Sequence, residues 1–539
     1  MPSDPGYDKM IGANGENIIP PERRVLILKR PLYGLRSSPE LYSSTARRIL
    51  EDDGYVPSTA DPCVFIKKLV NADGSKKMVT TRRPIYKQSA ASATKDWTRG
   101  TSLRTAQADA TPEYVEVEEQ DEHIVMIYVD DIYAISPLGG AIPYLSKLFE
   151  KHGFSLDPKP VINDGVTKTY FLGTEITQSA DRFEVTIGMQ GFIEGMVHDL
   201  ASDTANFVNG WDSTDETKQM WKTSRTFAVP MKPNSVLTPP TPEEKLLYKG
   251  DFPYRKVVGA LLWLQNVRPD ISQTVRQLAR HCLRYSYPHA EAAIHVLKYV
   301  YATRHMKIVY SANRGQFLPI DSALRTTDLN QYLSSDYGGK VYKTVDNKYV
   351  DLDHYRVLRH AQPLSEGLAR VDDDDKLIEI DTRLGQYTDA SFQSTFDYKS
   401  VSGYCIFYAG AVVDWGSQTQ TIVASSTMES ELNATHRAVT QLVPIRTLLE
   451  ELHEIAIELP TVSFEDNKAC KLVLNSSRRR KGARHIGRAL ERAHQWVSAG
   501  VVQYISCGTK EMVADIFTKP LAYDLFKTFR DRMLNVVSD

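Results

Sequence analysis

The chain of 539 residues is 42% hydrophobic and 24% charged, which is enough apolar sequence to bury ordinary cores and suggests roughly two to four domains. Lys and Arg number 65 against 67 Asp and Glu, so a net charge of −2 gives no global sign of a polyanionic partner. Five scattered cysteines, no run of about 20 apolar residues and no basic-then-apolar amino terminus argue against a disulfide framework, a membrane span and a signal peptide, and favour the cytoplasm or nucleus.

The first third of the chain contains one clear strand pair. Residues 24–68 alternate apolar runs with turn signals, whereas residues 69–122 are polar and predict a surface insertion. Order resumes at His123, where IVMIYVDDIYAI predicts two buried strands joined by a tight turn that carries Asp130 and Asp131. The following PYLSKLFEK, at residues 143–151, has helical spacing.

The middle of the chain is predicted to be helical. Between Lys249 and Met306, VVGALLWLQNV and SQTVRQLARHCL place apolar residues three and four positions apart. Residues 311–383 are polar and irregular and predict a linker or insertion. This segment and residues 69–122 offer few apolar positions to offset the entropy of ordering, so we expect both to be poorly packed.

After Leu384 the pattern changes to three strands and a helix, in LGQYTDAS, SGYCIFYAG, AVVDWGS and TMESELNATHRAVTQLV. Ser426 and Glu429 could form a capping box that starts the helix at Thr427, and Pro444 is expected to end or kink it. A strand (TVSFED), a helix, a strand (VVQYIS) and a short helix (MVADIFTK) complete an α/β order.

Acidic residues recur at the ends of these predicted elements. Taken singly, each is more often a helix cap or a solvated charge than a ligand. Carboxylates that converge from several elements, however, are what two hard cations need for phosphodiester chemistry, because Mg²⁺ prefers oxygen ligands. The candidates are Asp389, Glu431, Asp466 and Asp515.

The words around these acids occur in a fixed order along the segment. They are YTDAS at 387–391, KSVSGY at 399–404, SQTQTIVASSTMESE ending at Glu431, EDN at 465–467, RHI at 484–486 and ADIFTKPL at 514–521. In this order they resemble the ribonuclease H domain of copia-type retrotransposon Pol polyproteins.

That resemblance implies that the four acids hold two Mg²⁺ or Mn²⁺ ions, one activating water and the other stabilising the leaving oxygen of an RNA strand. Glu429 is the main rival to Glu431. We prefer Glu431 because the family pattern places the ligand just before L-N-A, and because Glu429 has a plausible role as a helix cap. Cellular ribonucleases H carry a mobile histidine shortly before the last acid, and this chain has none before Asp515.

A basic segment lies between two of the acids. Backbone phosphates of a hybrid duplex would be its natural partners, and a solvated basic loop and helix face is the alternative. The residues are Arg478, Arg479, Arg480, Lys481, Arg484, His485, Arg488 and Arg492, of which His485 is interpreted as a structural or phosphate-contacting residue.

The amino-terminal half has its own set of words. They are KRPLYGLRSSPELY at 29–42, ADPCVF at 60–65, YVDD at 128–131, YFLGTEI at 170–176, MKPN at 231–234, YRKVVGALLWL at 254–264, RPDI at 268–271 and HAEAAIHVLKYV at 289–300. They resemble copia-type reverse transcriptase, which implies that Asp130 and Asp131 are catalytic metal-binding residues of an RNA-directed DNA polymerase. The family's first catalytic aspartate should precede MPSDPGY, at residues 1–7, so we expect no primer extension by this chain alone.

The resemblance therefore implies an α/β (α+β) chain in three parts. Residues 1–310 would be a reverse transcriptase palm, thumb and connection with an insertion at 69–122, residues 311–383 a linker, and residues 384–539 a ribonuclease H-like mixed sheet flanked by helices, able to cleave by itself. The implied partners are an RNA–DNA hybrid, template RNA with primer, and other parts of the polyprotein, in virus-like particles in the cytoplasm or in the nucleus. Two alternatives stay open: a catalytically dead remnant that at most binds nucleic acid, and a fragment of a longer working polyprotein.

Overall fold

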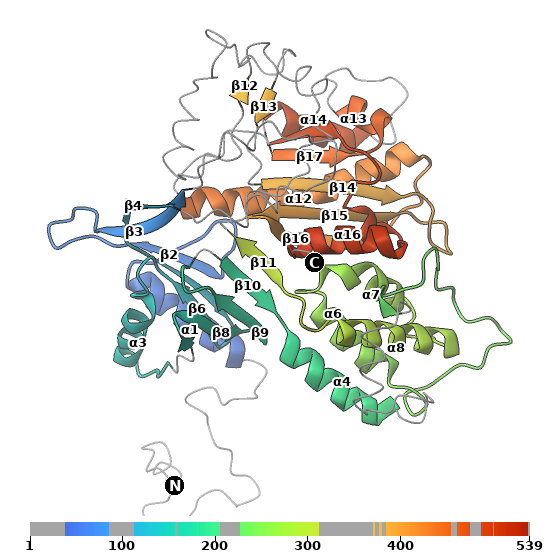
Figure 1. The fold of residues 1–539 in the computed structure, drawn as a ribbon, viewed down its shortest axis with the longest axis horizontal. Coiled ribbons are helices and arrows are strands. Elements are labelled where there is room, and N and C mark those ends of the chain that lie inside the picture. Colours follow the sequence, from blue (N-terminus) through green and yellow to red (C-terminus); the bar gives the residue numbers. More distant parts are fainter. Residues whose placement is uncertain are drawn as a thin grey trace, which may run out of the picture.

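The computed structural model combines several sheets with a block of helices (Figure 1). It describes residues 38–85, 113–156, 160–182, 184–204, 227–311, 370–371, 377–379, 384–453, 461–474, 487–499 and 501–536. The predicted linker at 311–383 lies outside these residues except for Ser311 and the paired strands β12 (Arg370–Val371) and β13 (Leu377–Glu379). Among the described helices, none is both long and apolar enough to cross a membrane.

The YVDD motif forms the predicted hairpin. Its strands belong to an antiparallel sheet of order β1-β2-β5-β6, made of β1 (Val56–Pro57), β2 (Val64–Lys68), β5 (Glu122–Tyr128) and β6 (Asp131–Ile135). Tyr128 pairs with Asp131, so Val129 and Asp130 make the turn, and Val129 has a positive φ of 57°. Helices α1 (Ser38–Asp52) and α3 (Ala141–Lys151) bury one face of the sheet around Phe65 and Val125.

The two ends of the predicted polar insertion pair with each other. Strand β3 (Met78–Ile85) runs antiparallel to β4 (Glu113–Gln120), and the residues between them lie outside the described part of the chain. An ion pair between Lys77 and Asp121, 2.7 Å between Nζ and Oδ2, closes the base of this ladder. The β-branched and aromatic residues in MVTTRRPI and EYVEVEEQ favour strands, a signal that the overall polarity of the segment obscures.

A second antiparallel sheet leads into the helical middle of the chain. Its order is β11-β10-β9-β8-β7, made of β7 (Val161–Asn163), β8 (Val166–Phe171), β9 (Thr174–Gln178), β10 (Glu184–Gly188) and β11 (Ile308–Ser311). Helix α4 (Gln190–Thr204) follows β10. The predicted helical region is confirmed as α6 (Tyr254–Leu264), the short helix η5 (Pro269–Ile271), α7 (Ser272–Ala279) and α8 (Tyr287–Ala302), which we call the helical block.

Residues 384–536 form a mixed sheet flanked by helices, as predicted, and we call them the sheet unit. Strands β14 (Leu384–Ser391), β15 (Val401–Tyr408) and β16 (Ala411–Thr419) are antiparallel, whereas β17 (Thr461–Glu465) and β18 (Val502–Ser506) run parallel to β14. Because strand side chains alternate, Ile406 faces the α12, α13 and α14 side and Phe407 the α15 and α16 side.

The helices of the sheet unit depart from the prediction in three places. Helix α12 (Thr427–His453) begins where predicted but continues through Pro444, whose lost backbone hydrogen bond is outweighed by apolar residues packed on both sides of it. Between β17 and β18 there are two helices, α13 (Lys468–Leu474) and α14 (Gly487–Ser498), instead of one. After α15 (Asp515–Thr518), α16 (Tyr523–Leu534) was not predicted.

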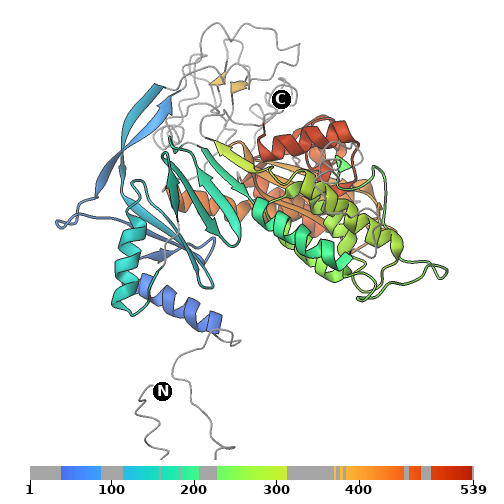
Figure 2. The same cartoon turned by 60° about the horizontal axis from the view of Figure 1, so that its bottom comes forward.

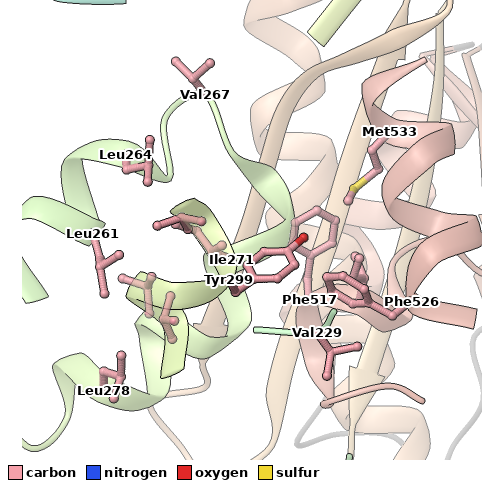
Figure 3. Packing of buried hydrophobic residues seen from close by; sticks show 14 of the residues in the cluster. Val229, Leu261, Leu264, Val267, Ile271, Leu278, Tyr299, Phe517, Phe526 and Met533 are labelled. Carbon is pink, nitrogen blue, oxygen red and sulfur yellow. The ribbon is translucent and has the colours of Figure 1, made fainter. Parts of the chain in front are cut away.

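One hydrophobic core joins the helical block to the sheet unit (Figure 3). Leu261 and Tyr299 from the block and Phe517 and Phe526 from the unit are all buried in it. The rings of Tyr299 and Phe526 meet edge to face, with centroids 5.9 Å apart. The two parts therefore fold as packed neighbours, and α4 lies on the outer side of the helical block (Figure 2).

A buried ion pair lies beside this core. Arg268 donates from Nε to Asp270 Oδ1 at 2.9 Å and from Nη2 to Asp270 Oδ2 at 2.7 Å, and both side chains are almost fully buried. Tyr299 also donates to Asp270, and Arg268 donates to the Thr303 carbonyl oxygen at 3.1 Å. A buried charged pair of this kind needs all its hydrogen bonds, because an unpaired buried charge is strongly destabilising.

Candidate metal centre

The four acids proposed from the sequence lie on four separate elements of the sheet unit. Asp389 is near the end of β14, Asp466 follows β17, Glu431 is in the second turn of α12 and Asp515 opens α15. Strands β14 and β17 are parallel and in register, with Tyr387 opposite Phe464. Parallel strands bring residues at equal offsets to the same edge, which places Asp389 beside Asp466.

Three of these acids meet at ligand distance. Asp389, Glu431 and Asp466 each offer a carboxylate oxygen, and these oxygens lie within 4.8 Å of one another. Asp389 and Glu431 are buried, and Asp466 is partly exposed. Glu431 Oε2 is buried and has no hydrogen-bond partner among the described residues. A buried, unpartnered carboxylate oxygen is costly unless a proton or a cation neutralises it.

Asp515 lies next to this trio, in contact with Asp389. Its carboxyl group is within hydrogen-bonding reach of Asp389, and Lys519 approaches its Oδ1 with Nζ at 2.9 Å. Thr518 donates from Oγ1 to Asp389 Oδ2 at 2.5 Å. Burial, then the charge of Asp389, raises the pKa of Asp515 to about 8 despite Lys519. We call Asp389, Glu431, Asp466 and Asp515 the acid cluster.

The electrostatics of the acid cluster favour a bound positive charge. Burial raises the pKa of Glu431 well above its usual range, and the negative charges of Glu465, Asp389 and Asp466 add to this. Burial and the charge of Asp389 also raise the pKa of Asp466, while Lys519 opposes them. Each rise reports that a second negative charge in this space is unfavourable. A cation would remove that penalty, and oxygen ligands suit Mg²⁺ or Mn²⁺.

Glu465 is a fifth acid at this edge, and the sequence analysis did not single it out. It is fully buried, and its carboxylate accepts from Asn467 N at 3.0 Å and from Thr388 Oγ1 at 3.3 Å. Burial raises the pKa of Glu465 to about 8, and the backbone N–H of Asn467 partly offsets this. The available signal was its position beside Asp466 at a strand end.

Glu429, the rival to Glu431, is bonded within its own helix start. Its Oε2 accepts from Ser425 N at 2.7 Å and from Ser425 Oγ at 2.6 Å. Its backbone N donates to Ser426 Oγ at 3.1 Å, which is half of the predicted capping box. In a complete capping box the Glu429 carboxylate would accept from the backbone N of Ser426, but here it accepts from the backbone N of Ser425. The Glu429 carboxylate thus has a structural use that Glu431 lacks.

The other proposed nucleic-acid and polymerase residues are placed differently. Asp130 and Asp131 are exposed at the hairpin tip, and no third acid joins them within the described ranges. The basic residues at 478–481, 484 and 485 lie outside the described residues, and of Arg488 only the backbone, in α14, is described. Arg492 is exposed, with its guanidinium 5.7 Å from the centroid of the Trp496 ring.

Comparison with known proteins identifies homologues among retrotransposon polyproteins. The chain is 24% identical over 316 residues to "Retrovirus-related Pol polyprotein from transposon RE1" and 24% over 320 residues to that from transposon RE2, both of Arabidopsis thaliana. Each match covers 58% of this chain and 17% of the relative. A match to "Transposon Ty1-DR5 Gag-Pol polyprotein" of Saccharomyces cerevisiae is 25% identical over 160 residues, covering 30% of this chain and 9% of the relative.

No protein-family model matches the chain. The chain spans about a sixth of the length of the Arabidopsis relatives it matches. Its homologues are copia-type Pol polyproteins, which confirms the family resemblance predicted from the sequence motifs.

Proposed function

We propose that the chain is the nuclease-bearing part of a copia-type retrotransposon Pol polyprotein and cleaves the RNA strand of RNA–DNA hybrids. The observation that carries the proposal is the convergence of three carboxylate oxygens within 4.8 Å, together with the buried, unpartnered Oε2 of Glu431. Acids on separate elements that meet in this way suit metal-dependent phosphodiester hydrolysis. The similarity to Pol polyproteins supports a nucleic-acid substrate, and the resemblance of the motifs to ribonuclease H points to the RNA strand of a hybrid.

Asp389, Glu431, Asp466 and Asp515 would hold two Mg²⁺ or Mn²⁺ ions. Bound there, such ions would activate a water molecule and stabilise the leaving oxygen of the RNA. The Thr518 hydroxyl fixes the carboxylate of Asp389, and Lys519 holds that of Asp515. The burial of Glu431 limits competing water around its carboxylate. The chain's own contribution is thus to orient the acids and to keep them poorly solvated, so that a cation is favoured.

A nucleic-acid duplex is the proposed partner of the surface around the acid cluster. Arg478, Arg479, Arg480, Lys481, Arg484, His485 and Arg488 would meet its backbone phosphates, because this is the strongest concentration of basic residues in the sequence. Template RNA, primer and the other parts of the polyprotein remain proposed partners by similarity.

Primer extension is not part of the proposed activity of this chain. Two metal ions need more than one adjacent pair of acids, and Asp130 and Asp131 have no third acid near them within the described ranges. Template-directed incorporation of labelled nucleotides by the purified chain, lost on Asp130→Asn, would overturn this part of the proposal.

The nuclease proposal is tested with the full chain, because the helical block shares its core with the sheet unit. A hybrid labelled on its RNA strand is incubated with the protein in Mg²⁺ or Mn²⁺, beside duplex DNA, which should be spared. Asp466→Asn keeps the size of the side chain but removes its charge, so cleavage should fall by orders of magnitude. Asp524→Asn makes the same change at an exposed position of α16 and should leave cleavage intact.

A folded chain that leaves the hybrid intact in both metals would refute the nuclease proposal. It would favour the alternative of a catalytically dead remnant that at most binds nucleic acid. Unchanged cleavage after Asp466→Asn would show instead that the acids were assigned wrongly.

A further inference from the structure

A cavity of about 170 Å³ lies between the helical block and the sheet unit, beside the acid cluster. Helix α7 supplies one wall, and the turn after β14, the end of α15 with Pro520, and the segment 234–237 supply the others. Thr518 and Lys519 line this cavity and also contact Asp389 and Asp515, respectively. Whatever occupies the cavity is therefore one side chain away from the acid cluster.

The described walls of the cavity carry positive charge. Their cationic side chains are Arg276, Arg280 and Lys519, and none of the described residues that line the cavity is Asp or Glu. Arg280 is paired with Asp397, 2.7 Å from Nη2 to Oδ1, and Lys519 with Asp515. Arg276 has no carboxylate partner among the described residues. A charged group in such a place favours an anion as its missing partner.

The hydrogen bonds of Arg276 leave part of its guanidinium available. On the sheet side, Nε donates to Ser417 Oγ at 3.0 Å and Nη1 to Thr419 Oγ1 at 2.9 Å. These bonds orient the group, and within the described residues Nη2 has no partner. Burial, then the charge of Arg280, lowers the pKa of Arg276 to about 10, so it stays positive at neutral pH.

A second, independent feature of the cavity is an orphaned donor. Gln273 lines the cavity and is only 4% exposed, yet its Nε2 has no hydrogen-bond partner among the described residues. A buried amide N–H without an acceptor is costly, so a ligand oxygen would satisfy it. A cationic N–H donor beside a free amide donor is complementary to the oxygens of a phosphate.

The turn after β14 is held against α7 by Arg280. Besides its ion pair with Asp397, the Arg280 guanidinium lies 4.4 Å from the centroid of the Phe396 ring. Thr395 Oγ1 donates to Asp397 Oδ1 at 2.7 Å, which positions Thr395 in the cavity wall. The cavity is thus assembled by both parts of the chain.

We infer that this cavity binds one backbone phosphate of the nucleic-acid substrate and so holds the hybrid in register with the acid cluster. The inference rests on the proposed nuclease function, since a substrate strand at the acid cluster is what would bring a phosphate within reach. Arg276 and Gln273 bind the phosphate, and Arg280 positions the wall. By this assignment the helical block contributes directly to substrate binding.

The test measures the binding of a fluorescent RNA–DNA hybrid to the full chain in EDTA, where no cleavage occurs. Arg276→Gln should weaken binding roughly three- to tenfold at about 0.1 M salt and lower the slope of log K against log salt by about one. Arg284→Gln removes the same charge from an exposed position just beyond α7 and is the matched control. Arg276→Lys restores the charge and should recover part of the affinity.

A second measurement identifies the phosphate. Hybrids with a single neutral methylphosphonate linkage are scanned along each strand, and one position should weaken binding to the wild-type chain but not to the Arg276→Gln variant. The inference is wrong if Arg276→Gln binds the hybrid as tightly as Arg284→Gln does. It is also wrong if the binding of Arg276→Gln is weakened by the methylphosphonate at every position that weakens the wild type. If inorganic phosphate raises the melting temperature of the wild type alone and no linkage is selective, the cavity binds free anions and the assignment to a backbone phosphate is overturned.

Cleavage separates this inference from the proposed function. A chain that binds the hybrid with these dependences but never cuts it would refute the nuclease proposal and leave the phosphate site standing. A chain that cuts the hybrid, but whose hybrid binding is unchanged by Arg276→Gln, would refute the phosphate site and leave the nuclease proposal standing. Unfolding curves of each variant, compared with the wild type, establish that the binding changes do not come from loss of the fold.

Discussion

Replacing Glu431 with Gln should make the metal-free protein more stable while removing its response to divalent cations. Glu431 is buried, one of its oxygens is unpartnered, and its pKa is raised by burial and by three neighbouring acids. Glutamine keeps the shape of the side chain but adds an amide N–H that can donate toward the adjacent carboxylates. Active sites commonly hold such unfavourable charge at the expense of stability.

The size of the effect follows from the geometry of the acid cluster. Two unit charges at the 4.8 Å limit repel by about 3.5 kcal/mol at an effective dielectric constant of about 20. Glu431 faces both Asp389 and Asp466 at this range. Part of the repulsion is already relieved by proton uptake, so we expect a gain of roughly 1–3 kcal/mol in the free energy of unfolding.

Urea unfolding at neutral pH, with EDTA or with saturating Mg²⁺, measures both effects. In EDTA the Glu431→Gln variant should be the more stable protein. In Mg²⁺ the wild type should gain about 2.7 kcal/mol at a free ion concentration one hundred times its Kd, whereas the variant should gain much less. Asp524→Asn should track the wild type in both buffers. A variant that is less stable in EDTA, or equally stabilised by Mg²⁺, would refute the reasoning.

Three further predictions follow from the same structure. Glu429→Gln should weaken the start of α12 by about 1 kcal/mol in thermal unfolding yet keep hybrid cleavage, whereas loss of cleavage in a folded variant would make Glu429 the ligand. Gly403→Ala places a Cβ 2.9 Å from the Ala514 carbonyl oxygen, so α15 should shift, with a loss of about 1–3 kcal/mol in urea unfolding and weaker cleavage; unchanged activity would contradict this. Asp270→Asn strands the buried Arg268 and should cost about 3–5 kcal/mol at neutral pH. Burial alone would raise the pKa of Asp270, but Arg268 and the hydrogen bonds of the carboxylate lower it in the folded chain. The stabilisation by Asp270 is therefore present above the unfolded pKa of about 3.9 and is lost as pH falls through the folded pKa. A stability difference between variant and wild type that instead grows toward low pH would count against this prediction.

Local signals in the sequence located the two strands of the YVDD hairpin, the five strands of the sheet unit and the start of α12, but not the sheet made of β7 to β11. The YVDD turn could be predicted because β-branched runs flank it. The helix start at Thr427 could be predicted because Ser426 and Glu429 have the spacing of a capping box. The end of α12 was not readable in this way, because tertiary packing on both sides of Pro444 outweighs the local cost of proline.

The acid cluster was readable only as a set. Asp389 and Asp466 are far apart in sequence, and parallel pairing of β14 with β17 brings them together. Glu465 escaped notice because β17 is buried on both faces, so alternation gave no sign of which way its side chain points. Arg276 was not predicted as a site residue, because nothing in the sequence of an amphipathic helix indicates that one of its arginines will bond the hydroxyl groups of β16.

The division of the chain into parts was the least accessible feature. Composition places a break at residues 311–383, but hydrophobic patterns do not say which partner an apolar face will bury against. In the structure the faces of α6 and α8 bury against residues from α15 and α16. Whether the sheet unit folds and cuts by itself therefore remains a prediction, and the expected penalty is the apolar surface that separation would expose.

The shared core also changes what the covalent link between β11 and β14 is needed for. Packing, and not the peptide chain, keeps the helical block against the sheet unit, with Tyr310 donating to the Val412 carbonyl oxygen at 2.7 Å as one further tie. A chain severed after β11 would behave as a split protein whose two polypeptides complement each other when made together. Either polypeptide alone would present a large apolar face and aggregate. Complementation would thus tolerate loss of chain continuity, but not loss of either face of the core.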